Sequence, residues 1–480
     1  MTTEYKTTIG LEIHAELKTR TKMFCDCRNE PEEKKPNINI CPVCMAHPGT
    51  LPVINKEAVK HVVKVGLALG GTIADFTEFD RKNYFYPDIP KGYQISQYKY
   101  PIVSGGSLNG VANTRVHLEE DTARSTHDKG DYTLIDFNRA GIPLMELVTE
   151  PVVRTAEEAS AFAKELQLLL RYLRVGDANM EKGEMRVEAN ISIQPRRPEG
   201  VGEPTEASAL GTKVEVKNLN SFKVVEKAIA YEIKRQIEVL EGGGKVAQET
   251  RGWDEGKQET FSQREKESSH DYRYFPDPDL PKLKLSEISE FSPEILNKEM
   301  PELPWNKRSR LVKDYGLKGE AAELFVQNTE LGAFFESVSA GRTPDFIKLA
   351  SNYITSDLLA LLKEKTGNIF SNVGGFIKLM EMIVSRKLSS RGAKDILLIM
   401  HSEGGDPEEI AESRGLKQES NEEKLREIVE KIVSENSEAV AQFKSGKESA
   451  IQFLVGQGMK EAKGSANPQV LKTLFLEKLK

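Results

Sequence analysis

Three segments of the chain alternate between apolar and polar residues, the pattern of β-strands that bury one face. Residues 9–17 place Glu12, His14 and Glu16 between apolar neighbours. Residues 184–193 and 213–217 alternate in the same way. The polar side of these two segments carries Glu184, Arg186, Glu188, Asn190, Ser192, Lys213, Glu215 and Lys217. The three strands are therefore predicted to present one polar surface rich in carboxylates and bases.

Apolar residues at helical spacing, bounded by capping signals, predict three helices in the same region. Asn55 begins a helix that ends at Gly70, and Thr155 with Glu158 forms a capping box for a helix that ends at Gly176. The third helix ends at the glycines 242–244 and carries an apolar stripe of Val225, Ile229, Ile233, Ile237 and Leu240. We expect these helices to pack against the sheet.

Mixed strand and helix patterns give way to almost uninterrupted helical spacing near residue 295. The stretch from Pro293 to Pro304 holds three prolines, and a second break before Pro407 contains two glycines. For 480 residues, about three domains are expected. We predict an α+β fold, with a domain at 1–295 built on an antiparallel sheet with packed helices, an all-helical domain at 296–405 and a small helical tail at 406–480.

Charge and hydropathy exclude several classes of protein. Lys and Arg number 67 and Asp and Glu 74, a net charge of −7, so any contact with nucleic acid must be local. No apolar run reaches the roughly 18 residues of a membrane span, and the first residues match no targeting signal. We therefore expect a soluble, cytoplasmic protein. Neither a Walker A loop nor a Rossmann glycine motif is present, so any nucleotide binding uses another architecture.

The polar surface of the predicted strands has two interpretations. An antiparallel sheet with one face in water is common and would explain the alternation without a ligand. The alternative is a cradle for Mg²⁺ and phosphate, because a hard cation needs oxygen ligands from several elements and a nucleotide needs Lys and Arg beside them. Repeated Glu together with Asn and His favours the cradle.

Two further segments add candidate chemistry. Residues 115–121 contain Glu119, Glu120 and Asp121 in succession, and residues 79–97 combine Arg81 and Lys82 with several aromatic residues. The second segment is either a loop held rigid by aromatic packing or a surface on which a nucleotide or an RNA base stacks.

The cysteines form one cluster in the sequence, Cys25, Cys27, Cys41 and Cys44. Four thiolates on two short knuckles match a closed tetrahedral Zn²⁺ site, which is structural because it leaves no position for substrate. Four unrelated thiols and an iron–sulfur cluster are the alternatives. In each case no cysteine is left to act as a glutaminase nucleophile, so any ammonia used must come from another chain.

Long motifs, in order along the whole chain, resemble one known family. They are IGLEIHAELKT, CPVC, FDRKNYFYPDIPKGYQISQ, HLEEDTARSTH, DFNRAGIPLMELVTEP, EANISI, GTKVEVKNLNSFK, QETRGWDE, DYRYFPDPDL and, near the C-terminus, AIQFLVGQGMKEAKGSANP. The chain resembles the B-type subunit of the aspartyl/glutamyl-tRNA(Asn/Gln) amidotransferases from end to end.

The resemblance implies a ligase that forms a carbon–nitrogen bond with glutamine as amido donor. ATP with Mg²⁺ would phosphorylate the side-chain carboxylate of Glu esterified to tRNA(Gln) or of Asp esterified to tRNA(Asn), and ammonia would then displace phosphate. Mg²⁺ and basic residues would offset charge on the transferred phosphoryl group. The ammonia would arrive through a channel from the A-type subunit, an amidase, which a small C-type subunit holds in a heterotrimer.

Carried onto this sequence, the family's Mg²⁺ and catalytic positions fall on Glu12, His14, Glu120 and Glu188. The alternation of residues 115–121 instead favours Glu119, which remains the alternative to Glu120. The family commonly has Asp at position 188, so Glu188 is a departure from its pattern. The candidate contacts to ATP phosphate or carboxylate are Arg81, Lys82, Lys217, Arg251 and Arg264.

The tail at 406–480 is expected to bind tRNA. Residues 444–480 hold seven Lys against three Glu, although the chain as a whole is acidic. A solvated helical face is the alternative explanation of this surplus. Two functions compete with the enzyme: a catalytically inert module that presents tRNA to an amidase, and a zinc-stabilised scaffold that binds no nucleotide.

Overall fold

The computed structural model describes residues 4–127, 130–195, 211–265, 272–364, 369–417, 422–462 and 466–479. They divide into two compact units, Met1–Pro304 and Trp305–Lys480. The first unit combines strands with helices, and the described part of the second is helical, which confirms the predicted α+β class. None of the described helices is both long enough and apolar enough to cross a membrane.

The main sheet of the first unit contains β1 (Tyr5–Glu16), β2 (Thr72–Ile73), β6 (Val103–Ser104), β7 (Ser107–Leu108), β8 (Val111–Glu120), β11 (Pro143–Thr149), β12 (Met185–Pro195), β13 (Val214–Leu219), β14 (Glu249–Asp254) and β15 (Glu259–Glu265). The strand order is β15-β14-β13-β12-β1-β11-β8-β6-β2, with β7 paired to β8. Neighbouring strands are antiparallel except β13 and β14, which run parallel. The apolar side chains of β1 and β12 are buried as predicted.

Three small sheets complete the strands of this unit. They pair β16 (Phe275–Pro276), β4 (Asp80–Asn83) and β5 (Tyr93–Ser96) in that order, β9 (Arg124–Thr126) with β10 (Leu134–Asp136), and β3 (Phe76–Thr77) with β17 (Leu283–Lys284). The three-stranded sheet lies beside the polar face of the main sheet, where Ser96 Oγ donates to Glu119 Oε2 at 3.3 Å. Residues 79–97 are therefore positioned next to the acidic strand β8.

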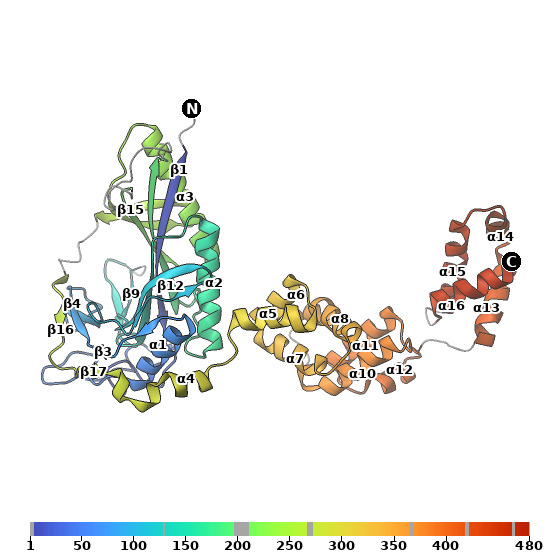
Figure 1. Cartoon of the computed structure of the whole chain (residues 1–480), viewed down its shortest axis with the longest axis horizontal. Helices are drawn as coiled ribbons and strands as arrows, with labels where there is room; N and C mark the ends of the chain where they lie inside the picture. The colour runs from blue at the N-terminus through green and yellow to red at the C-terminus, as the bar shows by residue number, and fades with distance from the viewer. Residues whose placement is uncertain are drawn as a thin grey trace. The chain divides into compact units, whose positions relative to one another are not determined.

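Helices of the first unit are α1 (Lys56–Ala68), α2 (Ala156–Tyr172), α3 (Phe222–Glu241) and α4 (Pro293–Glu299). Helices α2 and α3 pack against each other and along one face of the main sheet (Figure 1). The predicted caps are confirmed: Asn55 accepts from the first amides of α1, and Thr155 Oγ1 accepts from Glu158 N at 3.1 Å.

The predicted apolar stripe of α3 is only partly right. Val225 and Ile229 are buried, but farther along the helix the fully buried positions are Glu232 and Gln236, not Ile233. The Glu232 carboxylate is tolerated there because it accepts hydrogen bonds from Thr260 Oγ1 and Gln236 Nε2 and pairs with Arg235. A polar network thus fills a place that helical periodicity alone assigns to apolar side chains.

The second unit contains α5 (Pro304–Tyr315), α6 (Gly319–Gln327), α7 (Thr329–Ser339), α8 (Pro344–Tyr353), α9 (Leu359–Leu361), α10 (Val373–Val384), α11 (Ser390–Ser402), α12 (Pro407–Ser413), α13 (Glu422–Glu435), α14 (Ser437–Lys444), α15 (Ser449–Glu461) and α16 (Pro468–Leu479). A π-helical turn, η5 (Ile354–Leu358), joins α8 to α9. Helices α13, α15 and α16 supply a separate apolar cluster that includes Leu425, Leu454 and Phe475. The division of the helical part at residue 405 stays a prediction.

We expect Asn55→Ala to lower the free energy of unfolding by about 1–2 kcal/mol, because it removes the cap of α1. The side chain also donates to Thr21 O at 3.1 Å and Lys22 O at 3.2 Å, so the loss extends beyond the helix. Urea denaturation measures the change. Asn55→Asp is the comparison variant: it keeps the acceptor of the cap but replaces the donor with a charged oxygen that faces the carbonyl oxygens of Thr21 and Lys22. A wild-type midpoint for Asn55→Ala would contradict this role of the cap.

Candidate active site

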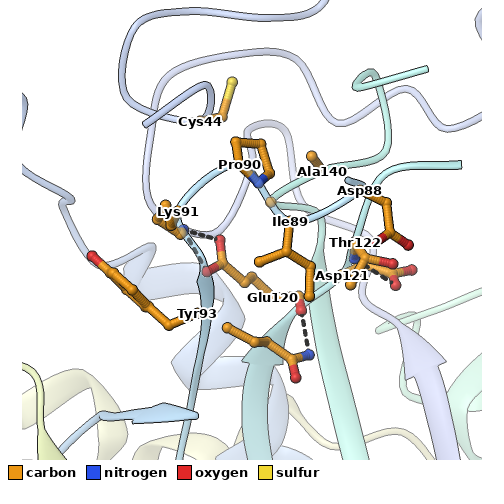
Figure 2. A pocket seen from close by; sticks show the side chains of 12 residues that line it. Cys44, Asp88, Ile89, Pro90, Lys91, Tyr93, Glu120, Asp121, Thr122 and Ala140 are labelled. Carbon is orange, nitrogen blue, oxygen red and sulfur yellow. Dashed lines mark hydrogen bonds and ion pairs between the residues drawn. The ribbon is translucent and has the colours of Figure 1, made fainter. Parts of the chain in front are cut away.

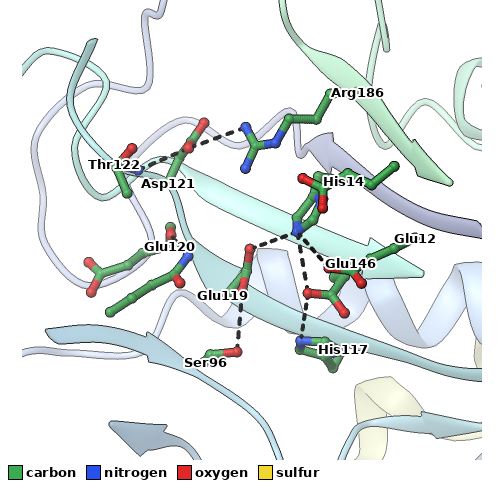
Figure 3. A network of polar contacts seen from close by, with 12 residues as sticks. Glu12, His14, Ser96, His117, Glu119, Glu120, Asp121, Thr122, Glu146 and Arg186 are labelled. Carbon is green, nitrogen blue, oxygen red and sulfur yellow. Dashed lines mark hydrogen bonds and ion pairs between the residues drawn. The ribbon is translucent and has the colours of Figure 1, made fainter. Parts of the chain in front are cut away.

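The register of the main sheet aligns four polar side chains in one row. His14 of β1 lies opposite Arg186 of β12 on one side and Glu146 of β11 on the other, and Glu146 lies opposite His117 of β8. Side chains that face one another across antiparallel strands are about 5 Å apart. Residues distant in the sequence therefore become neighbours on the polar face (Figure 3).

Within this row, His14 lies between carboxylates. Its Nε2 atom is 3.3 Å from Glu146 Oε2, 3.4 Å from Glu119 Oε1 and 4.0 Å from Glu12 Oε1. Glu146 Oε2 is also 3.6 Å from His117 Nε2. All of these residues except Glu12 are buried. Carboxylates gathered this closely away from water are costly unless a cation neutralises them, so the group is a candidate cation site.

A second acidic group shares Glu12 with the first. Oxygens of Glu12, Glu188 and Glu215 lie within 4.8 Å of one another, and so do ligand atoms of Glu12, His14 and Glu146. Lys217 Nζ is 3.0 Å from Glu188 Oε2 and 3.6 Å from Glu215 Oε2. Converging carboxylate oxygens are the donor set that Mg²⁺ takes, and the neighbouring ammonium suits phosphate. The described residues therefore fit a magnesium-nucleotide site.

Proximity changes the protonation of these groups. Burial, with the charges of Glu146 and Glu188, raises the pKa of Glu12 to about 7. Burial alone would lower the pKa of His14, but its hydrogen bond to Glu146 and the charges of Glu119 and Glu146 raise that pKa to about 8. Burial lowers the pKa of His117 to about 4, so this imidazole is neutral at pH 7.

Glu120 does not join the acidic group, whereas Glu119 does. Successive side chains of a strand point to opposite faces, and Glu120 is directed away from His14 (Figure 3). Its carboxylate accepts from Ile95 N at 3.0 Å and pairs with the Lys91 ammonium. Glu120 and Lys91 line a small pocket together with Cys44 (Figure 2). The alternation of β8, rather than the motif match, thus predicts which of the two carboxylates lies beside His14.

The candidate phosphate contacts divide into two groups. Lys82 and Lys217 lie at the acidic group. The Lys82 ammonium also lies 4.9 Å from the centre of the Tyr272 ring. Burial alone would lower the pKa of Lys82, but the charges of Tyr274 and Glu119 raise it. Arg81 is already paired, with Nε 2.9 Å from Asp277 Oδ2.

Arg251 lies on the opposite face of the sheet. Its Nε donates to Thr260 Oγ1 at 2.9 Å and is 3.5 Å from Glu232 of α3. Its neighbour Thr250 points to the acidic face, where its hydroxyl donates to Glu215. The structure therefore does not bring Arg251 to the site. The side chain of Arg264 lies outside the described residues.

Glu146 and His117 are functional candidates that the sequence patterns did not reveal as site residues. Glu146 lies in the segment PLMELVT of β11, whose apolar neighbours give it the appearance of a buried strand. The sequence feature that could have identified Glu146 is a single carboxylate inside an apolar run. Such a carboxylate is rarely buried without a partner, so its presence indicates one. His117 was visible as a neighbour of Glu119 in the alternation, but its contact with Glu146 depends on strand pairing.

The four cysteines converge in space. Their sulfur atoms lie within 4.8 Å of one another, and Cys27 Sγ is 3.9 Å from Cys44 Sγ. Zn–S bonds of about 2.3 Å in a tetrahedron require sulfur–sulfur distances of about 3.8 Å. A hydrogen bond from Cys25, together with the charge of Lys22, lowers the pKa of the Cys44 thiol to about 5. The cluster fits a structural Zn²⁺ ion.

Comparison with known proteins decides the family. The family model described as GatB/GatE catalytic domain matches residues 7–289, and that described as GatB domain matches residues 333–479. The chain belongs to the GatB family. It is thus a component of a glutamine-dependent, ligase-type amidotransferase.

Relatives match the GatB chain over nearly its whole length. The chain is 44% identical over 488 residues to a Thermoanaerobacter pseudethanolicus protein, with 99% of both chains covered. It is 44% identical to a Brevibacillus brevis protein, again with 99% of both covered, and 41% identical to one from Gloeothece citriformis, with 99% and 98% covered. All three are named as the B-type subunit of aspartyl/glutamyl-tRNA(Asn/Gln) amidotransferase.

We expect Mg²⁺ to bind the acidic group more tightly as the pH rises from 6 to 8. Protons on Glu12, with a pKa of about 7, and on His14, with a pKa of about 8, compete with the cation below these values. Displacing one proton makes the affinity roughly tenfold weaker at pH 6 than at pH 8. Calorimetry on the full-length chain measures this. Glu12→Gln should reduce the dependence to the part due to His14, and Glu120→Gln should keep it. A pH-independent wild-type affinity would contradict the assignment.

Proposed function

We propose that this GatB chain phosphorylates the side-chain carboxylate of Glu on tRNA(Gln), or of Asp on tRNA(Asn), and amidates it in the cytoplasm. The supporting observation is the buried acidic group around His14, which lies within the part of the chain that matches the catalytic-domain family. Glu12, His14, Glu119, Glu146 and Glu188 would hold Mg²⁺. A solvated sheet face without a ligand would not bury so many carboxylates together.

Phosphoryl transfer from ATP supplies the leaving group that amide formation needs. A carboxylate oxygen of the esterified amino acid attacks the γ-phosphorus, the bond to the β-phosphate oxygen breaks, and ADP leaves. Ammonia then attacks the acyl carbon, phosphate departs, and a proton is lost from nitrogen. When bound, Mg²⁺ offsets negative charge on the phosphate oxygens. Lys82 and Lys217, whose ammonium groups border the acids, would orient the phosphates and stabilise the same charge.

The ammonia is proposed to come from a partner amidase, the A-type subunit, held with a small C-type subunit. All four cysteines of the chain belong to the cluster, and their geometry suits Zn²⁺, so none is available as a glutaminase nucleophile. The GatB chain would thus receive ammonia that another protein of the heterotrimer releases. The zinc ion would stabilise the knuckles at 25–44 and take no part in the reaction.

The helical tail at 406–480 is proposed to bind the tRNA. Helices α13, α15 and α16 form an apolar core against which α14 packs, and lysines on these helices are exposed. Lys478 and Lys431 are each neutralised by a glutamate, but Lys444, Lys460 and Lys472 are exposed and available for phosphate. Lysine contacts to phosphate recognise the shape of an RNA rather than its sequence.

The decisive test compares two neighbouring carboxylates. In the assembled enzyme with Glu-tRNA(Gln) and ATP, we expect Glu119→Gln to slow ADP formation by about 100-fold, because it removes one charge from the cation site. Glu120→Gln, the matched control, should stay within a few fold of wild type in this step. The measurement is the rate of ADP release without glutamine.

The opposite ranking of the two variants would return the metal position to Glu120. If the wild-type enzyme formed no ADP in response to Glu-tRNA(Gln) or Asp-tRNA(Asn), the chain would instead be a module that only presents tRNA.

Replacing Lys444, Lys460 and Lys472 with Ala should weaken tRNA binding most at low salt. Each lost phosphate contact reduces the slope of log affinity against log salt by about 0.7–0.9. Filter binding at several salt concentrations measures the slope. A control triple variant at Lys424, Lys431 and Lys478 removes equal charge from the same unit and should leave the slope closer to wild type. Equal slopes for both variants and the wild type would contradict tail binding.

A further inference from the structure

Lys22 is an anomaly in the interior of the first unit. Its side chain is 0% exposed and is among the largest fully buried side chains of the described residues. Lysine is almost never fully buried without a charged partner, since desolvating an ammonium costs several kcal/mol. Among the described residues no carboxylate lies within ion-pair distance of it, and its Nζ donates to the carbonyl oxygen of Phe137 at 3.1 Å. A single carbonyl does not neutralise this charge.

The backbone fixes Lys22 beside the cysteine cluster. Its amide donates to Cys27 O at 2.9 Å, and the next amide, of Met23, donates to Gly141 O at 2.7 Å. A methyl group added to Gly141 would lie 3.6 Å from Lys22 Cδ, 3.8 Å from Cys44 Cβ and 3.9 Å from Oε2 of Glu120, a carboxylate that is already paired with Lys91. The lysine stem and the Cys44 side chain therefore lie over the same glycine.

Lys22 is a positive counter-charge for the negatively charged cysteine cluster. Four thiolates around Zn²⁺ leave a net double negative charge, which is most costly to leave without a counter-charge at Cys44, the buried member of the cluster. Cys41 N donates to Cys44 Sγ at 3.1 Å, but a backbone amide carries no net charge. An ammonium and a thiolate attract each other more strongly in a low-dielectric interior than in water. The buried Lys22 ammonium and the buried Cys44 thiolate would therefore each lower the cost of burying the other.

We propose that Lys22 is the buried counter-charge of the zinc-thiolate cluster and a positioning residue for metal retention. This inference rests on the zinc site of the proposed function. It goes beyond that site by assigning a role to a residue that is not a ligand. Lys22 also joins the first knuckle, through its amide bond to Cys27 O, to the segment at Phe137, through its ammonium.

Zinc retention by Lys22 variants tests the proposal. Lys22→Met keeps the length of the side chain and removes the charge, and Lys22→Gln removes the charge but keeps a donor. In the full-length chain we expect both to raise the zinc dissociation constant about tenfold or more, while Lys22→Arg stays near wild type. Competition with a chromophoric chelator gives the constant, and the thiolate charge-transfer band of the Co²⁺-loaded protein reports the four-sulfur geometry.

Lys18→Met is the matched control, because it removes an exposed ammonium paired with Asp177 and should leave zinc affinity unchanged. Wild-type affinity in Lys22→Gln would overturn the role of Lys22, and that variant decides the matter if Lys22→Met fails to fold. A correctly folded wild-type protein that binds no zinc would overturn the zinc site itself. The two failures are therefore distinguishable.

Discussion

The pairing of β1 with β11 and β12 is the constraint on which the proposed chemistry depends. It places His14 opposite Glu146 and Arg186, and Glu12 opposite Glu188. Because side chains alternate, a slip of β1 by one residue would turn Glu12 and His14 toward the helices and bring the apolar side chains of β1 to the polar face. The apolar residues of β1, which are almost completely buried, make such a slip costly. Burial on one face thus fixes the chemistry on the other.

Neighbouring charged groups of the site shift the pKa values of one another. Glu12 and Glu119 both have raised pKa values because burial disfavours their charged forms, whereas the pKa of Glu146 is held well below its usual range by His117 and His14 despite burial. Such a wide range of pKa values among neighbouring groups is characteristic of functional sites. A cation bound here would also stabilise the folded protein, since its charge would relieve the mutual repulsion of the carboxylates.

Sequence patterns predicted the strands and the helix caps because these depend on neighbours a few residues away. The polar faces of β1 and β12, with Glu12, His14 and Glu188, followed from alternation alone. Glu146 and the opposite orientation of Arg251 could not be found in this way, because they depend on which strands pair and on which face a helix covers. The buried Glu232 was missed for the same reason: its partners Thr260 and Arg251 come from other elements.

The two adjacent carboxylates at the end of β8 couple the position of the acidic group to that of the small pocket. Glu119 contributes to the acid group and Glu120 to the pocket beside Cys44, yet a single peptide bond links them. A rotation of that strand end would therefore move both carboxylates at once and in opposite directions. The acidic group and the small pocket are linked through one backbone unit, so neither can be rearranged without altering the other.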